Sequence, residues 1–139
     1  MIGRDPVALG LPHREPFIFI DAVLELQAGE LALCRKRFLP EEPFFRGHFP
    51  GDPLVPGVIL TEALAQTAGI AASREGVAFR LTAIKGMKFF SAVRPEEEIA
   101  LRARKTASVG GLWQFEVSAR VGERVVAEGV VVLSESTVQ

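Results

Sequence analysis

One stretch of this chain contains a histidine, a glycine and a glutamate that could do chemistry together. His48 lies in a proline-rich segment, Gly57 follows a proline, and Glu62 stands in a run of otherwise apolar residues. Imidazole titrates near neutral pH and can accept a proton, and a carboxylic acid can donate one. His48 and Glu62 are therefore candidates for a general acid/base pair, although a lone histidine is more often structural than catalytic.

Glu62 has a second polar residue within reach along its own segment. In a helix, Gln66 lies at i+4 from Glu62, so the two share a face and can hydrogen-bond. That bond would orient the carboxyl group, and burial would favour its protonated form, as an acid role requires. The alternative is that Glu62 simply faces solvent.

Gly57 is the third candidate, because it precedes the expected helix. The first backbone N–H groups of a helix are unpaired, and the helix dipole there favours negative charge. A substrate carbonyl oxygen at Gly57 would be polarised as in an oxyanion hole. A simple turn glycine explains this residue equally well.

The segment that carries His48 and the helix that carries Glu62 differ in composition. Residues 40–56 contain five prolines, which stiffen the backbone, and a loop of this length usually has a function. From Val58 to about Arg74 we predict a helix that starts after Pro56-Gly57, with Gly76 as a stop signal. It is apolar on nearly all faces, so we expect it to be buried.

The remaining segments have the alternation and turn signals of strands. Turns are expected at Ala28-Gly29, at Gly110-Gly111 and at Gly122-Glu123, the last as a type II′ hairpin. Strands are predicted over residues 17–26, 30–39, 79–90 (with a bend at Gly86), 99–107, 113–121 and 125–133. The last is apolar at nearly every position and is expected inside the sheet, whereas residues 134–139 are expected to fray.

These elements predict an α+β fold. An antiparallel six-stranded sheet would have to curl around the one long helix to bury both. The length of 139 residues suits a single domain spanning residues 1–139.

Composition excludes several classes of function. The formal net charge of −1 gives no electrostatic case for nucleic acid, and no apolar run reaches the roughly 18 residues that span a bilayer. No signal peptide is recognisable at the start, and the single Cys34 fits a reduced, cytoplasmic setting. With two histidines and one cysteine, neither a metal site nor a cofactor is expected.

Five motifs resemble one known family over nearly the whole length of the chain. They are similar to the 3-hydroxyacyl-acyl-carrier-protein dehydratases of bacterial type II fatty-acid synthesis, and to their glutamate-bearing branch in particular. The motifs are Leu11-Pro12-His13-Arg14 with Pro16-Phe17, Pro43-Phe44-Phe45 with Gly47-His48-Phe49-Pro50-Gly51, Pro56-Gly57-Val58, Glu62-Ala63-Leu64-Ala65-Gln66, and Val126-Ala127-Glu128.

The resemblance implies a fold, an assembly and a reaction. The fold would be the hot dog, a curved sheet around one long helix, paired as a homodimer and in some members as a trimer of dimers. The enzyme would be a hydro-lyase of fatty-acid and lipid metabolism that converts (3R)-3-hydroxyacyl-ACP to trans-2-enoyl-ACP. Acyl carrier protein (ACP) would be the partner that carries the substrate.

The same resemblance implies a role for each candidate residue. His48 would remove the C2 proton, and Glu62 of the partner subunit would assist loss of the 3-hydroxyl group as water. The Gly57 amide would polarise the thioester carbonyl, with Phe49 and Val58 beside it in the substrate-binding part, and Gln66 would orient Glu62.

Three positions depart from the family pattern. Glu15 stands where a tyrosine is common, and Pro95-Glu96-Glu97 replaces the usual Pro-Gly-Asp. Phe90-Ser91 replaces a basic pair that is expected near the face on which the carrier protein docks.

Two other functions fit the same fold. A hot-dog thioesterase would hydrolyse acyl-ACP or acyl-CoA, and a non-catalytic module would only bind acyl chains.

His13 is expected to pack or hydrogen-bond at the sheet edge beside Arg14, with a role as a second base as the alternative. Cys34 is expected to be a small apolar residue of a strand and not a nucleophile.

Overall fold

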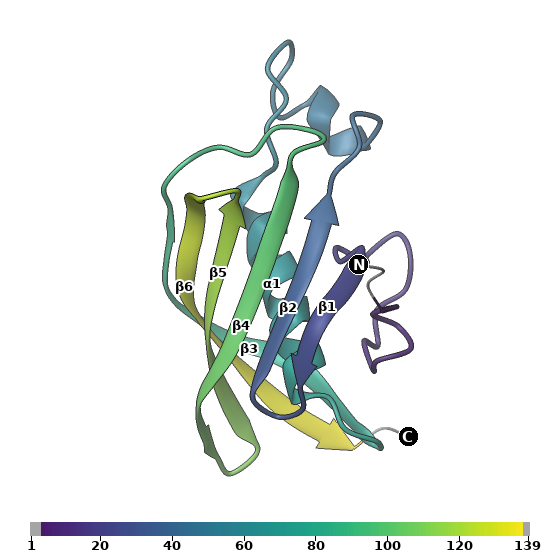
Figure 1. Cartoon of the computed structure of the whole chain (residues 1–139), viewed down its shortest axis with the longest axis vertical. Helices are drawn as coiled ribbons and strands as arrows, with labels where there is room; N and C mark the ends of the chain where they lie inside the picture. Colours follow the sequence, from purple (N-terminus) through teal and green to yellow (C-terminus); the bar gives the residue numbers. More distant parts are fainter. Residues whose placement is uncertain (1–3, 138–139) are drawn as a thin grey trace.

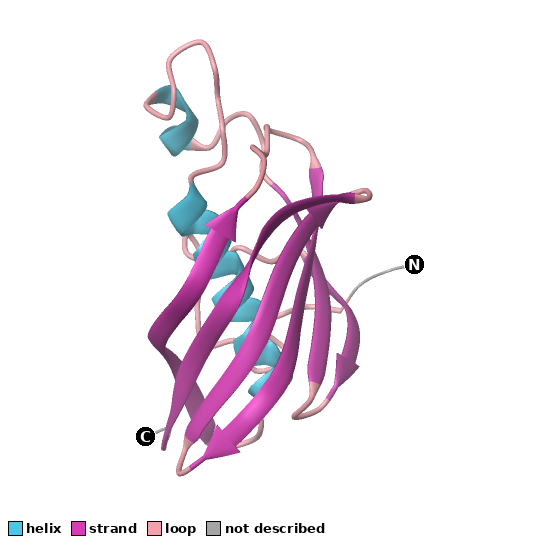
Figure 2. Cartoon of the chain, turned by 90° about the vertical axis from the view of Figure 1, so that its left-hand side faces the viewer, coloured by secondary structure: helices cyan, strands magenta, loops and turns pink. Residues whose placement is uncertain are grey.

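One antiparallel sheet wraps around one long helix in the computed structural model, which describes residues 4–137. The six strands lie in the order β1-β2-β4-β5-β6-β3. The helix α1 lies along one face of the sheet (Figure 1), and the sheet curves around it (Figure 2). The elements are β1 (Ala22–Gln27), β2 (Leu31–Arg37), the 3-10 helix η1 (Pro43–Arg46), α1 (Gly57–Ala72), β3 (Val77–Phe89), β4 (Glu98–Val109), β5 (Leu112–Val121) and β6 (Arg124–Thr137). The predicted architecture is confirmed.

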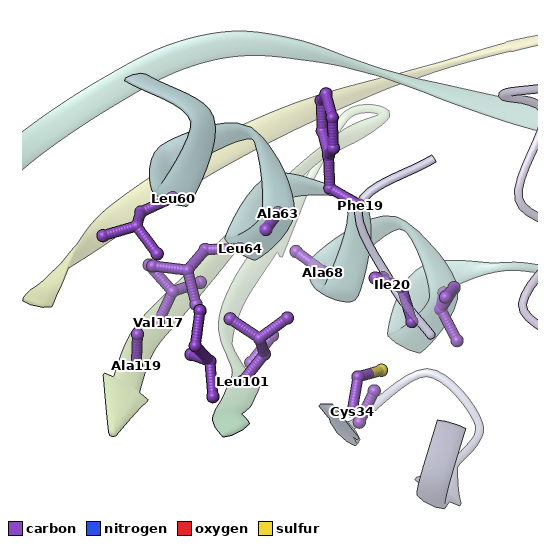
Figure 3. Packing of buried hydrophobic residues seen from close by; sticks show 14 of the residues in the cluster. Phe19, Ile20, Cys34, Leu60, Ala63, Leu64, Ala68, Leu101, Val117 and Ala119 are labelled. Carbon is purple, nitrogen blue, oxygen red and sulfur yellow. The ribbon is translucent and has the colours of Figure 1, made fainter. Parts of the chain in front are cut away.

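The helix α1 is buried on almost every side, as its composition predicts. Figure 3 shows Leu60 and Leu64 beside Val117, a residue of the sheet. The helix ends at Ala72, two residues before the predicted end at about Arg74, and Arg74 instead forms a bridge with Val77 in the turn that leads into β3. No helix within residues 4–137 is long and apolar enough to cross a membrane.

The first strand is shorter than the prediction of residues 17–26. β1 begins at Ala22, and Phe17 to Ile20 form no strand. The reason is a distant side chain: the Phe19 N–H donates to Oε1 of Gln66 at 2.9 Å, and Nε2 of Gln66 donates to the Phe17 carbonyl at 3.0 Å. The amide of a helix residue therefore takes the place of a neighbouring strand.

The predicted fraying of residues 134–139 is wrong for the part that the structure describes. β6 continues to Thr137 because β3 pairs with it along this stretch, from Val77 opposite Thr137 to Arg80 opposite Ser134. The Glu135 carboxylate accepts hydrogen bonds from Trp113 and Arg74. Residues 138–139 lie outside the described residues.

Three further details of the sheet match the sequence analysis. β6 lies between β5 and β3, which confirms that the last strand is internal. The hairpin between β5 and β6 has Gly122 at φ +60° while Glu123 keeps a negative φ, as a type II′ turn requires. β3 also has a register shift between Lys85 and Lys88, at the predicted bend.

Glu96 adopts a backbone conformation that suits glycine. Its φ is +69°, and it follows Pro95 in a turn closed by a hydrogen bond from the Glu97 N–H to the Arg94 carbonyl. This is the third position of a type II turn, where a positive φ favours glycine. We expect Glu96→Gly to raise the free energy of unfolding by about 0.5–1 kcal/mol, because relief of the left-handed strain outweighs the added chain entropy. The melting temperature should rise by about 2–6 °C.

A matched substitution two residues further on separates this effect from a general effect of glycine. Glu98 begins β4 and has no positive φ, so Glu98→Gly should lower stability. Thermal and denaturant unfolding of both variants beside the wild type would measure the difference. Equal or lower stability of the Glu96→Gly variant would contradict the expected strain.

Candidate active site

The loop that presents His48 is fixed by its own backbone hydrogen bonds. The His48 N–H donates to the Phe44 carbonyl of η1 at 3.0 Å, and the His48 carbonyl accepts from the Leu54 N–H at 2.9 Å. Phe49 and Asp52 exchange two N–H···O bonds of 2.9 Å at the loop tip. The segment projects beyond the end of the sheet, above the start of α1 (Figure 2), so this part of the chain holds His48 near the helix N-terminus.

The contacts of the His48 ring define which nitrogen is free. Its Nδ1 lies 3.0 Å from the carbonyl oxygen of Leu54. A carbonyl only accepts hydrogen bonds, so Nδ1 carries the proton and Nε2 keeps its lone pair. The ring stacks on Phe49 with centroids 4.0 Å apart and lines a cavity together with Gly57 and Phe89. His48 can therefore act as a base toward a group in this cavity.

Gly57 is the first residue of α1, and its lack of a side chain has a structural reason. Its φ is not positive, so a special turn conformation does not require glycine here. A Cβ atom at this position would lie 3.1–3.3 Å from the ring of Phe89. Among the described residues, no hydrogen bond uses the Gly57 N–H, which leaves this donor available beside His48.

Glu62 and Gln66 form the predicted pair on α1. Nε2 of Gln66 donates to Oε2 of Glu62 at 3.0 Å. The amide of Gln66 is itself held by the backbone of Phe17 and Phe19, so its orientation is fixed. The Glu62 side chain is 20% exposed and lines a second cavity.

His13 lies against Glu62 of α1, and it lines the same cavity as Phe79 of the edge strand β3. Its Nε2 is 3.5 Å from Oε2 of Glu62, and its ring stacks on Phe17 with centroids 6.0 Å apart. The Arg14 guanidinium donates to the carbonyls of Leu11, Pro12 and His13, which stabilises the turn. The sequence analysis missed this contact, although Leu11-Pro12-His13-Arg14 was one of the motifs that signalled the family.

His48 and Glu62 of one chain belong to different cavities. His48 and Gly57 line one, whereas Glu62, Gln66 and His13 line the other. Glu62 lies five positions after Gly57 on the helix, so the two residues lie about 140° apart around the helix axis. Within residues 4–137, no hydrogen bond or ion pair joins His48 to Glu62. One chain therefore places the two candidate residues in separate cavities.

Comparison with known proteins identifies the family. A model of the FabA-like domain matches residues 11–130. The 3-hydroxyacyl-[acyl-carrier-protein] dehydratase FabZ of Ruminiclostridium cellulolyticum is 42% identical over 123 residues, which cover 86% of this chain and 87% of the relative. The FabZ of Paracidovorax citrulli is 38% identical over 135 residues, which cover 92% of each. The chain belongs to the FabZ dehydratase family.

Solved structures share the fold at much lower identity. The dehydratase heterocomplex ApeI:P from Xenorhabdus doucetiae superposes with a TM-score of 0.79 at 14% identity, covering 96% of this chain and 93% of that one. The fluoroacetyl-CoA thioesterase FlK superposes with a TM-score of 0.66 at 18% identity, covering 81% and 90%. Both likenesses show the hot-dog fold, which this FabZ-family chain has.

Two residues that the FabZ resemblance assigned to substrate binding are exposed neighbours of His48 and Gly57. Phe49 is 48% exposed and contacts His48. Val58 is 78% exposed on the first turn of α1. Neither lines the His48 cavity within one chain, so both roles stay predictions.

Cys34 is a buried residue of β2, as expected. Burial raises the pKa of its thiol to about 12, an effect that a hydrogen bond with Thr67 partly offsets. The thiolate is therefore nearly absent at neutral pH, and the thiol has no nucleophilic role. Within residues 4–137, no group of three or more histidine, cysteine, aspartate or glutamate side chains is arranged to hold a metal ion.

Proposed function

We propose that this chain dehydrates (3R)-3-hydroxyacyl-ACP to trans-2-enoyl-ACP in fatty-acid biosynthesis, as a hydro-lyase. The observation that carries the proposal is the cavity lined by His48 and Gly57. In it, the imidazole of His48 with its free Nε2 lies beside the Gly57 N–H of the helix N-terminus, which donates no hydrogen bond. The FabZ relatives at 36–42% identity support the same reaction.

His48 is the base of the proposed reaction. Its Nε2 takes the C2 proton of the substrate, and the electron pair of that C–H bond forms the C2–C3 double bond. Removal of this proton places negative charge on the thioester oxygen, which the Gly57 N–H stabilises. Phe49 and Val58 contact the substrate at the edge of this cavity.

Glu62 is the proposed acid. Its protonated carboxyl group gives a proton to the 3-hydroxyl group as the C3–O bond breaks, so that water leaves. Gln66 fixes the direction of this carboxyl group through its 3.0 Å hydrogen bond, and His13 lies on the same oxygen. Return of the proton from His48 to Glu62 through solvent resets the site.

A homodimer completes the proposed site, with Glu62 supplied by the partner subunit. The separate cavities of one chain support this assembly, because one contains the base His48 without Glu62 and the other contains Glu62 without His48. β3 is an edge strand and exposes the apolar side chains of Leu81 and Ile84, which makes it a surface suited to a second copy. Three such dimers can associate further into a trimer of dimers.

The substrate carrier of the proposed reaction is acyl carrier protein, and its compartment is the cytoplasm. The names of the FabZ relatives support the carrier. The exposed Phe89 and Phe90 at the end of β3 lie beside the His48 cavity, where the carrier has to deliver the thioester.

A hydration assay tests the proposal against its alternative. Purified protein is mixed with a trans-2-enoyl-ACP, and enoyl absorbance and free thiol are followed in parallel. The proposal requires enoyl absorbance to fall to a stable equilibrium without release of thiol. Thiol release without loss of the enoyl group would instead establish a thioesterase, the function that the FabZ relatives do not favour. The parallel thiol trace separates the two.

A further inference from the structure

A single arginine side chain holds the irregular segment that joins β3 to β4. Nε of Arg124 donates to Oγ of Ser91 at 3.2 Å, and Nη2 donates to the Ala92 carbonyl at 3.2 Å. The same Nη2 donates to Oε2 of Glu97 at 3.0 Å. Arg124 is the first residue of β6, so a different strand gathers these three acceptors. Ser91 and Glu97 stand at two of the positions where the chain departs from the family pattern.

The Glu97 carboxylate is fixed by a second donor. Its Oε1 accepts a hydrogen bond from the Arg94 N–H at 2.8 Å. This bond is the main cause that lowers the pKa of the Glu97 carboxyl group, whereas partial burial raises the pKa and the Arg124 guanidinium lowers it further. The Arg124 side chain is 44% exposed, and an exposed ion pair adds little to stability. What the planar guanidinium provides is therefore a fixed geometry for several acceptors.

The segment held by Arg124 contacts the peptide group that fixes the His48 ring. The Val93 carbonyl accepts a hydrogen bond from the Val55 N–H at 2.8 Å. That N–H belongs to the same peptide group as the Leu54 carbonyl, which lies 3.0 Å from Nδ1 of His48. A hydrogen bond to the N–H of a peptide group orients its carbonyl and makes it a better acceptor. Three residues of the segment also line the cavity of His48 and Gly57, namely Ser91, Ala92 and Val93.

One residue connects the guanidinium to this peptide group. The Ala92 carbonyl that Arg124 holds belongs to the peptide group that ends at the Val93 nitrogen, so fixing it restricts the backbone of Val93. The Val93 side chain is buried, at 1% exposure, which anchors the same residue. The backbone hydrogen bonds at the two ends of the segment lie further away, at Phe90 and Glu96. The direction of the Val93 carbonyl therefore depends on Arg124.

We propose that Arg124 is a positioning residue for His48. It holds the Val93 carbonyl against the peptide group of Leu54 and Val55, and so keeps the imidazole proton on Nδ1 and the lone pair on Nε2. Arg124 does not line the cavity and therefore acts only through this contact. The inference rests on the proposed dehydration for its effect on rate, whereas the His48 tautomer can be measured without turnover.

Replacement of Arg124 should lower the rate and leave substrate affinity nearly unchanged. We expect Arg124→Met to lower kcat for trans-2-enoyl-ACP hydration by about 5–30-fold, with KM within about twofold, because the base is displaced while the groups that contact the substrate stay. Arg124→Lys keeps the charge beside Glu97 but not the fork, so kcat should fall by only about 2–5-fold. Arg120→Met is the matched control. Arg120 is exposed in the same hairpin, its side chain forms no hydrogen bond or ion pair within residues 4–137, and the variant should keep full activity.

The tautomer of His48 is a readout that a merely structural role would not change. The chain has two histidines, so the His48→Ala variant assigns both imidazoles in a nitrogen NMR spectrum. At about pH 8.5, where unperturbed imidazole is neutral, the wild type should show the Nδ1–H tautomer at His48. Arg124→Met should show a mixture with the Nε2–H tautomer. The signals of His13, and all signals of Arg120→Met, should stay as in the wild type.

The two measurements separate this inference from the proposed function. If the wild type hydrates no enoyl-ACP but Arg124→Met changes the His48 tautomer, the proposed reaction fails and the positioning role stands. An unchanged His48 tautomer in Arg124→Met overturns the inference whatever the rate does, and an equal loss of kcat in Arg120→Met overturns it as well. Should thermal unfolding show that the methionine variant does not fold, the tautomer in Arg124→Lys decides in the same way.

Discussion

Replacement of His48 by alanine, or of Glu62 by glutamine, is expected to lower kcat for enoyl-ACP hydration by about 10²–10⁴-fold, the usual contribution of a positioned general acid or base. The His48 variant loses the Nε2 lone pair that the Leu54 contact leaves free. The Glu62 variant keeps the shape of the side chain and its neighbour Gln66 but cannot give a proton. Steady-state kinetics of each purified variant would measure the loss.

In the proposed reaction His48 and Glu62 act in one step, so the effects of replacing them should not add. The double variant should be about as slow as the slower single variant. Glu123→Gln serves as the matched control, because Glu123 lies in the β5–β6 hairpin turn and lines neither cavity; it should retain full activity. All variants should unfold at the wild-type temperature within a few degrees. Near-native turnover in either single variant would remove that residue from the mechanism.

The elements that sequence reasoning located well are those with strong local patterns. α1 is apolar on nearly all faces and lies where the composition placed it, apart from two residues at its end. β5 alternates cleanly and was located to within one residue of its start. Local periodicity predicts such elements well. The reason is that burial of their apolar side chains, on one face or on all faces, contributes most of the free energy that stabilises them.

The failures come from contacts between distant parts of the chain. Phe19 is separated by 47 residues from Gln66, whose amide replaces a strand partner for it. The polar residues Ser134–Thr137 were expected to fray because nothing local favours a strand, but β3 pairs with them. Neither contact has a signature in the nearby sequence.

The candidate site could be proposed from the sequence as a set of residue types but not as an arrangement. Spacing and the family motifs pointed to His48, Gly57 and Glu62, whose roles stay predictions. The contact of His13 with Glu62 could not be predicted, because it depends on the turn that Arg14 holds in place.

Because His48 and Glu62 line separate cavities of one chain, we expect a mixture of the two inactive variants to regain activity. If His48 and Glu62 of one active site come from different subunits, the two inactive variants should restore each other. A mixed dimer of His48→Ala with Glu62→Gln has one site with both residues native and one site with neither, because C₂ symmetry makes the two wild-type sites equivalent.

We therefore expect the mixture to be far more active than either variant. When equal amounts are unfolded and refolded together, random pairing makes roughly half of the dimers mixed, each with one working site of two, so about a quarter of wild-type activity should return. Each variant refolded alone is the control and should stay at its own background. If both residues of a site came from one chain, every site in the mixture would lack one of them. Absence of recovery in a sample where differently tagged subunits are shown to pair would place the site within one chain, and the two cavities of α1 would then need another explanation.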